Sequence, residues 1–471
     1  MNTPRLLTDY DACDLTEMLQ SRDISVRQVL EACLARIDAV NPTVNAIVSL
    51  RPREDLLAEA DKMDTSGPAS NQPLWGLPIA IKDLENTRDL LSTSGSPLFA
   101  DNVPKDDSLM VSRLRAAGVL IIGKTNVPEF GLGSHSYNPI FGVTRNAYDQ
   151  SRSAGGSSGG AAVVLATGML PIADGSDMMG SLRNPAGWNN VYGFRPTAGL
   201  VAKDAEGDAW SQSLSTNGPM ARSPRDMDLM LRVIGQPDHR QPLGLPAYKG
   251  YKNVNPKNIS IGWIRDWSGY YPMEKGVLET CENALDIFRD LGCTIMEYTP
   301  TIAPESLWDA WNILRSHSVA CASAPLWQDP AKRALLKDAH IWEIEQGLSY
   351  SARDIHHAGI IRSDWFREVA GLNLTTLALP SAQMFPFDAD ISWPKTVAGN
   401  AMDTYHRWME IVIPASLIGL PAVSVPAGFS PHNLPMGLQL IGKAGQDAQL
   451  MGLAQKYHEA TQFPQNHPPQ I

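Results

Sequence analysis

The chain has 471 residues, of which 43 % are hydrophobic and 19 % are charged. This composition supplies enough apolar side chains for a large buried core and excludes an intrinsically disordered protein. The 39 basic and 50 acidic residues give a net charge of −11, which argues against nonspecific binding to nucleic acid or to an anionic membrane.

Helices are predicted for the first 65 residues. Apolar side chains recur every three or four positions from Val26 to Cys33, and Ser25 is a suitable N-cap for the helix that contains them. A stretch rich in Pro, Gly, Ser and Asn follows at residues 66–73 and breaks this pattern. We therefore expect residues 1–65 to form an N-terminal helical segment that packs on the rest of the protein.

Strands and helices alternate after this break. Residues 77–83 (LPIAIKD) are predicted to begin with a buried strand, residues 108–118 to form a helix that ends at a glycine, and residues 119–122 to form the next strand. Further along the chain, residues 259–264 are predicted as a strand and residues 276–292 as a helix. This alternation is typical of the α/β class with a mostly buried sheet.

The segment Gly118–Thr125 (GVLIIGKT) fits the pattern of a phosphate-binding loop. Such a loop needs flexible residues between its glycines and a helix after its threonine. Here the intervening residues are Val, Leu, Ile and Ile, and Asn-Val-Pro follows the threonine. We interpret this segment as a strand and not as an ATP site.

Two loops rich in glycine and serine carry the candidate chemistry. The first covers residues 153–160 (SAGGSSGG) and the second covers residues 174–186, which include Ser181. A serine at the start of a helix lies near backbone N–H groups that can stabilise an oxyanion, but it needs a base to act as a nucleophile. None of the ten histidines lies in a recognisable triad motif, and Lys82, at the end of an apolar run, is the alternative base because burial lowers a lysine pKa.

The chain resembles the amidase signature family of serine hydrolases. The resemblance is densest over residues 75–235, returns at residues 411–442, and is weak over residues 240–400. The blocks that carry it, in chain order, are Pro78–Asp83, Gly123–Phe130, Gly155–Gly160, Ser176–Ala186, Gly193–Thr197, Gly218–Arg222, Gly419–Ala422 and Leu434–Gly442.

The resemblance implies an α/β/α sandwich around a large, mixed and mostly parallel twisted sheet. It implies a single amidase domain over residues 66–471, in which the variable region, at about 240–400, roofs the substrate site. It also implies a Ser–Ser–Lys triad in which Ser181 is the acylated nucleophile, Ser157 is a relay preceded by a cis peptide bond, and Lys82 is the general base.

The same resemblance suggests which groups contact the substrate. The oxyanion hole would consist of the backbone N–H groups of Met178, Met179, Gly180 and Ser181. Gly133, Ser134 and His135 would line the cleft together with the two methionines, although a structural role for His135 is as well supported. Many family members carry glycine where this chain has Met179, so this departure concerns the substrate more than the mechanism.

The expected activity is hydrolysis of a small-molecule amide through an acyl-enzyme, without cofactor, metal, nucleic acid or membrane. Met178, Met179 and the several tryptophans of the variable region favour an apolar or aryl amide. Two alternatives stay open: the amidase subunit of a tRNA-dependent amidotransferase, and a catalytically dead binding protein on the same scaffold. We expect a cytoplasmic protein that is either a monomer or a homodimer.

The five cysteines predict neither a disulfide framework nor a zinc site. Their number is odd, and no two of them have CxxC spacing. The N-terminal segment has no apolar run of the kind found in signal peptides, and the sequence contains no apolar stretch long enough to span a membrane. These features agree with the expected location and with a catalytic site that uses side chains alone.

Overall fold

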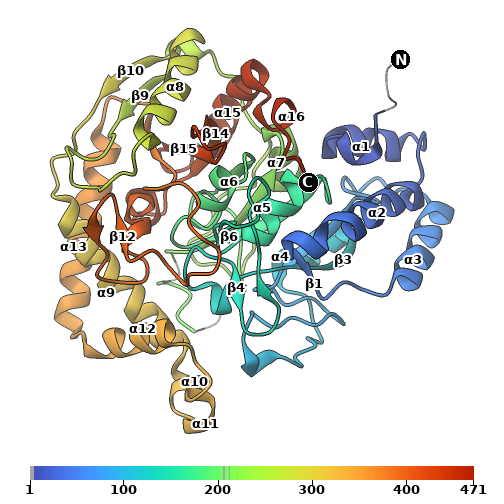
Figure 1. The fold of residues 1–471 in the computed structure, drawn as a ribbon, viewed down its shortest axis with the longest axis horizontal. Helices are drawn as coiled ribbons and strands as arrows, with labels where there is room; N and C mark the ends of the chain where they lie inside the picture. The colour runs from blue at the N-terminus through green and yellow to red at the C-terminus, as the bar shows by residue number, and fades with distance from the viewer. Residues whose placement is uncertain (1–4, 205–206, 212) are drawn as a thin grey trace.

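The computed structural model describes residues 5–204, 207–211 and 213–471. A large sheet runs through the molecule, with helices on both sides of it (Figure 1). Its strands, in spatial order, are β10 (Thr294–Glu297), β9 (Ser260–Trp263), β11 (Thr376–Pro380), β15 (Pro435–Gly442), β14 (Ala422–Phe429), β7 (Tyr192–Arg195), β8 (Thr216–Ala221) and β6 (Ile172–Asp177).

The sheet is large and mixed, as predicted, but the prediction that it is mostly parallel is wrong. Within the described residues, β9 pairs in parallel with β10 and with β11, and the other neighbouring pairs are antiparallel. The short connection between β14 and β15 makes them a hairpin, which forces an antiparallel pair. Hydrophobic runs indicate buried strands but do not encode the direction in which those strands pair.

Side-chain alternation along β15 shows which helices cover each face of the sheet. A side chain at Gly437 would meet Gly187 of α6 (Asn184–Trp188), whereas one at Gly442 would meet Leu450 of α15 (Asp447–Thr461). Successive residues of a strand point to opposite faces, so α6 and α15 lie on opposite faces of the sheet. The helices α7 (Pro224–Ile234) and α8 (Val277–Asp290) contact α15, and α5 (Gly159–Ala166) contacts α6.

A second, three-stranded sheet joins the N-terminal helices to the core. Its strands are β1 (Ile47–Val48), β3 (Leu120–Thr125) and β2 (Pro78–Lys82), in that order. The helices α1 (Ala12–Gln20), α2 (Val26–Val44) and α3 (Arg53–Ser66) form in the predicted segment, and Ser25 caps α2 as expected. The strand β1 was not predicted, because two residues are too few to produce a periodic pattern.

The segment resembling a phosphate-binding loop is a strand, as interpreted from the sequence. Its residues 120–125 form β3, which follows α4 (Leu109–Ala116). The side chain of Lys124 is buried and bonds to Thr87 Oγ1 at 2.9 Å and to Ser92 Oγ at 3.1 Å. A strand with a buried lysine leaves no loop to surround a phosphate.

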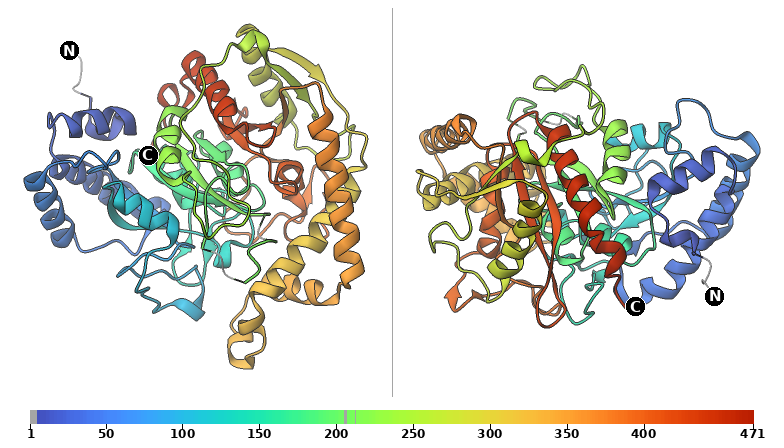
Figure 2. Two further views of the ribbon diagram at one scale, coloured as in Figure 1. Left: turned by 180° about the vertical axis from the view of Figure 1, so that it is seen from behind. Right: turned by 90° about the horizontal axis from the view of Figure 1, so that it is seen from above.

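The variable region is mainly helical and lies at the opposite end of the molecule from α1–α3 (Figures 1 and 2). The helices α9 (Pro304–Ala322), α12 (Asp338–Ser349) and α13 (Ala352–Gly371) pack together, with α9 between the other two. The remaining short elements are α10 (Ala324–Trp327), α11 (Pro330–Arg333), α14 (Ile413–Ser416), α16 (Phe463–Asn466), and the strand pairs β4 (Tyr137–Asn138) with β5 (Gly142–Val143) and β12 (Thr396–Val397) with β13 (Asn400–Ala401).

Candidate active site

Lys82 is the last residue of β2, and its ammonium group lies among hydroxyl groups. Nζ is 2.9 Å from Ser157 Oγ, 2.8 Å from Ser158 Oγ and 2.9 Å from Ser176 Oγ. The residue is fully buried, and this burial lowers the Lys82 pKa to about 7, although nearby carboxylates oppose the shift. A lysine with such a pKa has a substantial neutral fraction at physiological pH and can then accept a proton.

A cavity of about 160 Å³ opens beside this lysine, and both predicted serines line it. Ser157 follows a cis peptide bond from Gly156, as the resemblance implies, and precedes α5. Ser181 lies in the loop between β6 and α6. The full lining consists of Leu84, Phe130, Gly131, Leu132, Gly133, Ser134, Ser157, Ser176, Met178, Met179, Ser181, Ser215, Arg315, Val319 and Met409.

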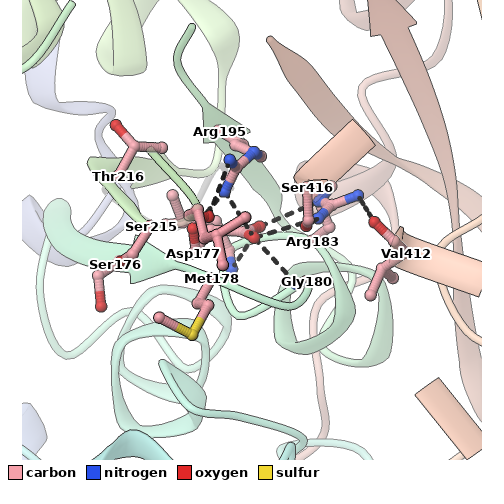
Figure 3. Close-up of polar contacts among 12 residues, drawn as sticks. Ser176, Asp177, Met178, Gly180, Arg183, Arg195, Ser215, Thr216, Val412 and Ser416 are labelled. Carbon is pink, nitrogen blue, oxygen red and sulfur yellow. Dashed lines mark hydrogen bonds and ion pairs between the residues drawn. The ribbon is translucent and has the colours of Figure 1, made fainter. Parts of the chain in front are cut away.

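The loop that carries Ser181 is held by a buried ion cluster centred on Asp177. Arg183 Nε is 3.0 Å from Asp177 Oδ2, and Arg195 Nη1 is 3.2 Å from Asp177 Oδ1 (Figure 3). Burial alone would raise the Asp177 pKa, but the two guanidinium groups hold it below its ordinary value. Arg183 also donates to Ser416 Oγ at 2.7 Å, so the loop is tied to α14. The predicted loop-holding roles of Asp177 and Arg183 are confirmed.

The predicted oxyanion hole is only partly available. Gly180 N–H donates to Asp177 Oδ1 at 2.9 Å, so it is already engaged within the loop and is removed from the predicted donors. The N–H groups of Met178, Met179 and Ser181 make no hydrogen bond within the described part of the chain. Three of the four predicted donors therefore remain free next to the cavity.

The three residues predicted to line the cleft divide between two cavities. Gly133 and Ser134 line the cavity of the serines and also a neighbouring one of about 210 Å³. His135 lines only the neighbouring cavity, where its ring nitrogens bond to Ser153 Oγ and to the carbonyl oxygen of Ala389. Burial lowers the His135 pKa to about 4, so the ring is neutral and has a structural role.

The variable region contributes to the cavity differently from what its composition suggested. Trp308, Trp311 and Trp365 are buried in the hydrophobic core, and none of the tryptophans lines the cavity of the serines within the described residues. The region instead supplies Arg315 and Val319, which lie one helical turn apart on α9. The expectation of an aromatic roof is therefore wrong, and a cation that composition did not indicate is present.

Several residues of the site were missed in the sequence. Ser158 and Ser176 bond to Lys82, and the carboxyl of Asp174 accepts the Lys82 backbone N–H at 3.0 Å. Asp174 is fully buried, which raises its pKa to about 7. Their positions inside the two serine- and glycine-rich loops were a usable signal, whereas Arg315 comes from a helix that carries no motif.

The described residues contain no group of three or more His, Cys, Asp or Glu side chains suited to a metal ion. Among the helices of the described chain, none combines the length and hydropathy needed to cross a membrane. The chemistry available at the site is therefore that of hydroxyl groups, an amine and backbone N–H groups.

Comparison with known proteins assigns this arrangement to a family. Residues 28–451 match the sequence profile of the Amidase family. The chain belongs to the amidase signature family. A solved structure of a bacterial aryl acylamidase of this family superposes with a TM-score of 0.88 at 25 % identity, covering 98 % of this chain and 99 % of that one. The family and its fold, both expected from the sequence, are thus confirmed.

Two curated relatives represent the two kinds of amidase signature enzyme, the amidotransferases and the amide hydrolases. The first belongs to the glutamyl-tRNA(Gln) amidotransferase of Thermus thermophilus, and this protein is 34 % identical over 470 residues, covering 93 % of this chain and 94 % of the relative. The second is an acylamidase of Rhodococcus erythropolis, which is 30 % identical and covers 95 % of this chain and 94 % of the relative. Amide-bond chemistry is common to both.

Proposed function

We propose that the protein is a stand-alone amide hydrolase that forms an acyl-enzyme on Ser181 and acts on an uncharged apolar or aryl amide. The observation that carries this proposal is the contact of the buried Lys82 amine with Ser157 Oγ at 2.9 Å, in the wall of a cavity that Ser181 also lines. A neutral amine, a hydroxyl relay and a second hydroxyl in one cavity are the parts that acyl transfer requires.

The reaction begins with proton transfer through the relay. Neutral Lys82 takes the proton of Ser157 as Ser157 takes the proton of Ser181, and Ser181 Oγ attacks the amide carbonyl carbon. The N–H groups of Met178, Met179 and Ser181 are the available donors for the resulting oxyanion. The relay then returns the proton to the leaving amine, and water hydrolyses the acyl-enzyme by the same route.

The apolar wall of the cavity supports the substrate class. Leu84, Phe130, Val319 and Met409 line it together with the two methionines that precede the nucleophile. Methionine adapts its shape to irregular apolar groups. An aryl or branched apolar group next to the scissile bond would bury more of its surface in this cavity than a small polar amide.

The second candidate is the amidase component of an amidotransferase, and the similarity to the Thermus thermophilus protein favours it. Such a component works within a partner-bound assembly and releases ammonia from glutamine. The two methionines before Gly180 and the net charge of −11 weigh against this role in the present chain. The two candidates predict different substrates, so one set of assays separates them.

The test is kcat/KM of the purified chain for an anilide, a short aliphatic amide, a carboxylated ureide and glutamine. Because each buried methylene contributes about 0.8 kcal/mol, we expect the anilide to be favoured by at least about tenfold over the short aliphatic amide. Preference for glutamine, together with co-purification of a second protein chain, would establish the second candidate instead. No labelling by a serine-directed phosphonate would indicate a catalytically dead scaffold.

A further inference from the structure

Arg315 is a buried cation in the wall of the catalytic cavity. Its side chain is 3 % exposed and projects from α9, one helical turn before Val319. Among the residues that line this cavity in the described chain, it is the only one with a charged side chain. The proposed proton relay does not use it, so its position needs another explanation.

Two groups hold the guanidinium from the side away from the nucleophile loop. Nε is 2.6 Å from Glu343 Oε1 on α12, and Nη2 donates to Tyr405 Oη at 2.8 Å. Tyr405 in turn donates to the same Glu343 oxygen at 2.8 Å, and Ser316 Oγ donates to the other at 2.6 Å. Each holding group is itself held, so the orientation of Arg315 is well defined.

The remaining nitrogen, Nη1, has only a weak partner. Its one hydrogen bond within the described residues is to Sδ of Met178 at 3.3 Å. A thioether sulfur is a poor acceptor, whereas a guanidinium nitrogen is a strong donor. Nη1 therefore presents unused donor capacity at the edge of a cavity that Ser157 and Ser181 also line.

The charge around Arg315 indicates which kind of acceptor fits. Glu343 is fully buried, and although burial opposes its ionisation, Arg315 keeps its pKa below the ordinary value. The guanidinium charge is thus already balanced by a carboxylate at contact distance. A second carboxylate would be repelled by Glu343, whereas an uncharged oxygen would accept the Nη1 proton without this penalty.

We propose that Arg315 is a specificity-determining residue, whose Nη1 donates a hydrogen bond to an uncharged oxygen of the substrate, such as a ketone, amide or ether oxygen, on the Met178 side of the cavity. Glu343 and Tyr405 are positioning residues for it. The inference rests on the proposed amidase function and narrows its substrate class to apolar amides that carry such an oxygen. An apolar substituent of the same shape would leave Nη1 facing only the thioether.

The test uses anilides that carry one substituent of nearly constant shape: acetyl, isopropyl or carboxylate, placed either on the ring or on the acyl group. In one of these two series we expect the wild-type kcat/KM for the acetyl compound to exceed that for the isopropyl compound by about tenfold, because a buried donor is left poorly paired by the latter. The carboxylate compound is expected to be no better than the acetyl compound.

The variants separate recognition from folding. Arg315→Met alone leaves Glu343 buried and unpaired, so the double variant Arg315→Met, Glu343→Gln is made with it; in both, the acetyl preference should fall to about one. Tyr405→Phe should lower the preference by raising KM for the acetyl compound while kcat changes little. Arg367→Met is the matched control, because this arginine of α13 is 67 % exposed and its variant should keep the wild-type preference.

Binding to Ser181→Ala gives a readout that does not depend on turnover. Titration of that variant with the same compounds should reproduce the acetyl preference, and adding Arg315→Met with Glu343→Gln should abolish it. Equal affinities for acetyl and isopropyl compounds, or a preference that survives the arginine replacement, would overturn the inference, and preference for the carboxylate would overturn the choice of an uncharged oxygen. Absence of hydrolysis with the acetyl preference in binding intact would contradict only the proposed function.

Discussion

The catalytic cavity is built by two regions that are held in different ways. The loop from Asp177 to Arg183 is fixed by a buried cluster in which two guanidinium groups meet one carboxylate, and its backbone N–H groups point to the site. The helix α9 contributes only the side chains of Arg315 and Val319 from its surface. A buried ion cluster tolerates little change, whereas a side chain that projects from a helix can be replaced without moving the backbone. The difference suggests that the loop determines the chemistry and α9 determines which amide is chosen.

The largest effect is expected at the loop itself. Ser181→Ala removes the proposed nucleophile and should lower kcat by at least about 10⁴-fold, because residues of a catalytic unit cannot replace one another. The fold should persist, since the Asp177 cluster does not include the Ser181 side chain. Activity within tenfold of wild type, measured with an anilide, would mean that Ser181 is not the nucleophile.

The second effect is on stability. Asp177→Asn removes the carboxylate between Arg183 and Arg195 and should lower the free energy of unfolding by about 3–5 kcal/mol, because buried charges are left without a counterion. The matched control is Asp364→Asn, in a surface pair with Arg367, where denaturant unfolding should show little change. Equal effects at the two sites would show that the cluster does not hold the loop.

The third effect is a shift in pH dependence. The Lys82 pKa of about 7 predicts that kcat/KM rises with pH through about 7 and then levels, because only the neutral amine accepts the relay proton. The Asp174 carboxylate raises the Lys82 pKa, so Asp174→Asn should move this limb to lower pH. The asparagine can still accept the Lys82 backbone N–H through Oδ1. A limb that moves to higher pH would contradict the electrostatic role of Asp174.

The smallest effect is expected on α9. Val319→Ala removes two methyl groups from the cavity wall and should lower kcat/KM for an anilide by less than about tenfold, while the pH profile stays unchanged. Ile360→Ala on α13 is a control, because that side chain is 43 % exposed and does not line the cavity. A changed pH midpoint in Val319→Ala would mean that α9 acts on the relay as well as on selection.

The same two regions differ in how far they could be predicted. Lys82, Ser157 and Ser181 lie in continuous sequence blocks, and Ser25, α2 and α8 follow from capping and apolar periodicity. Strand direction was missed because parallel and antiparallel strands share the same buried pattern. Arg315 was missed because a single arginine on an amphipathic helix looks like a surface residue until α12 and Tyr405 are placed against it.

The central claim is that a neutral Lys82 activates Ser181 through Ser157. Its most direct test is peptide mapping by mass spectrometry after reaction with a fluorophosphonate across the pH range. The account predicts one adduct, on Ser181, whose rate of formation rises through about pH 7 and is strongly reduced in Lys82→Arg, because arginine stays protonated. An adduct on Ser157 or on another serine, or an unchanged rate in Lys82→Arg, would contradict it.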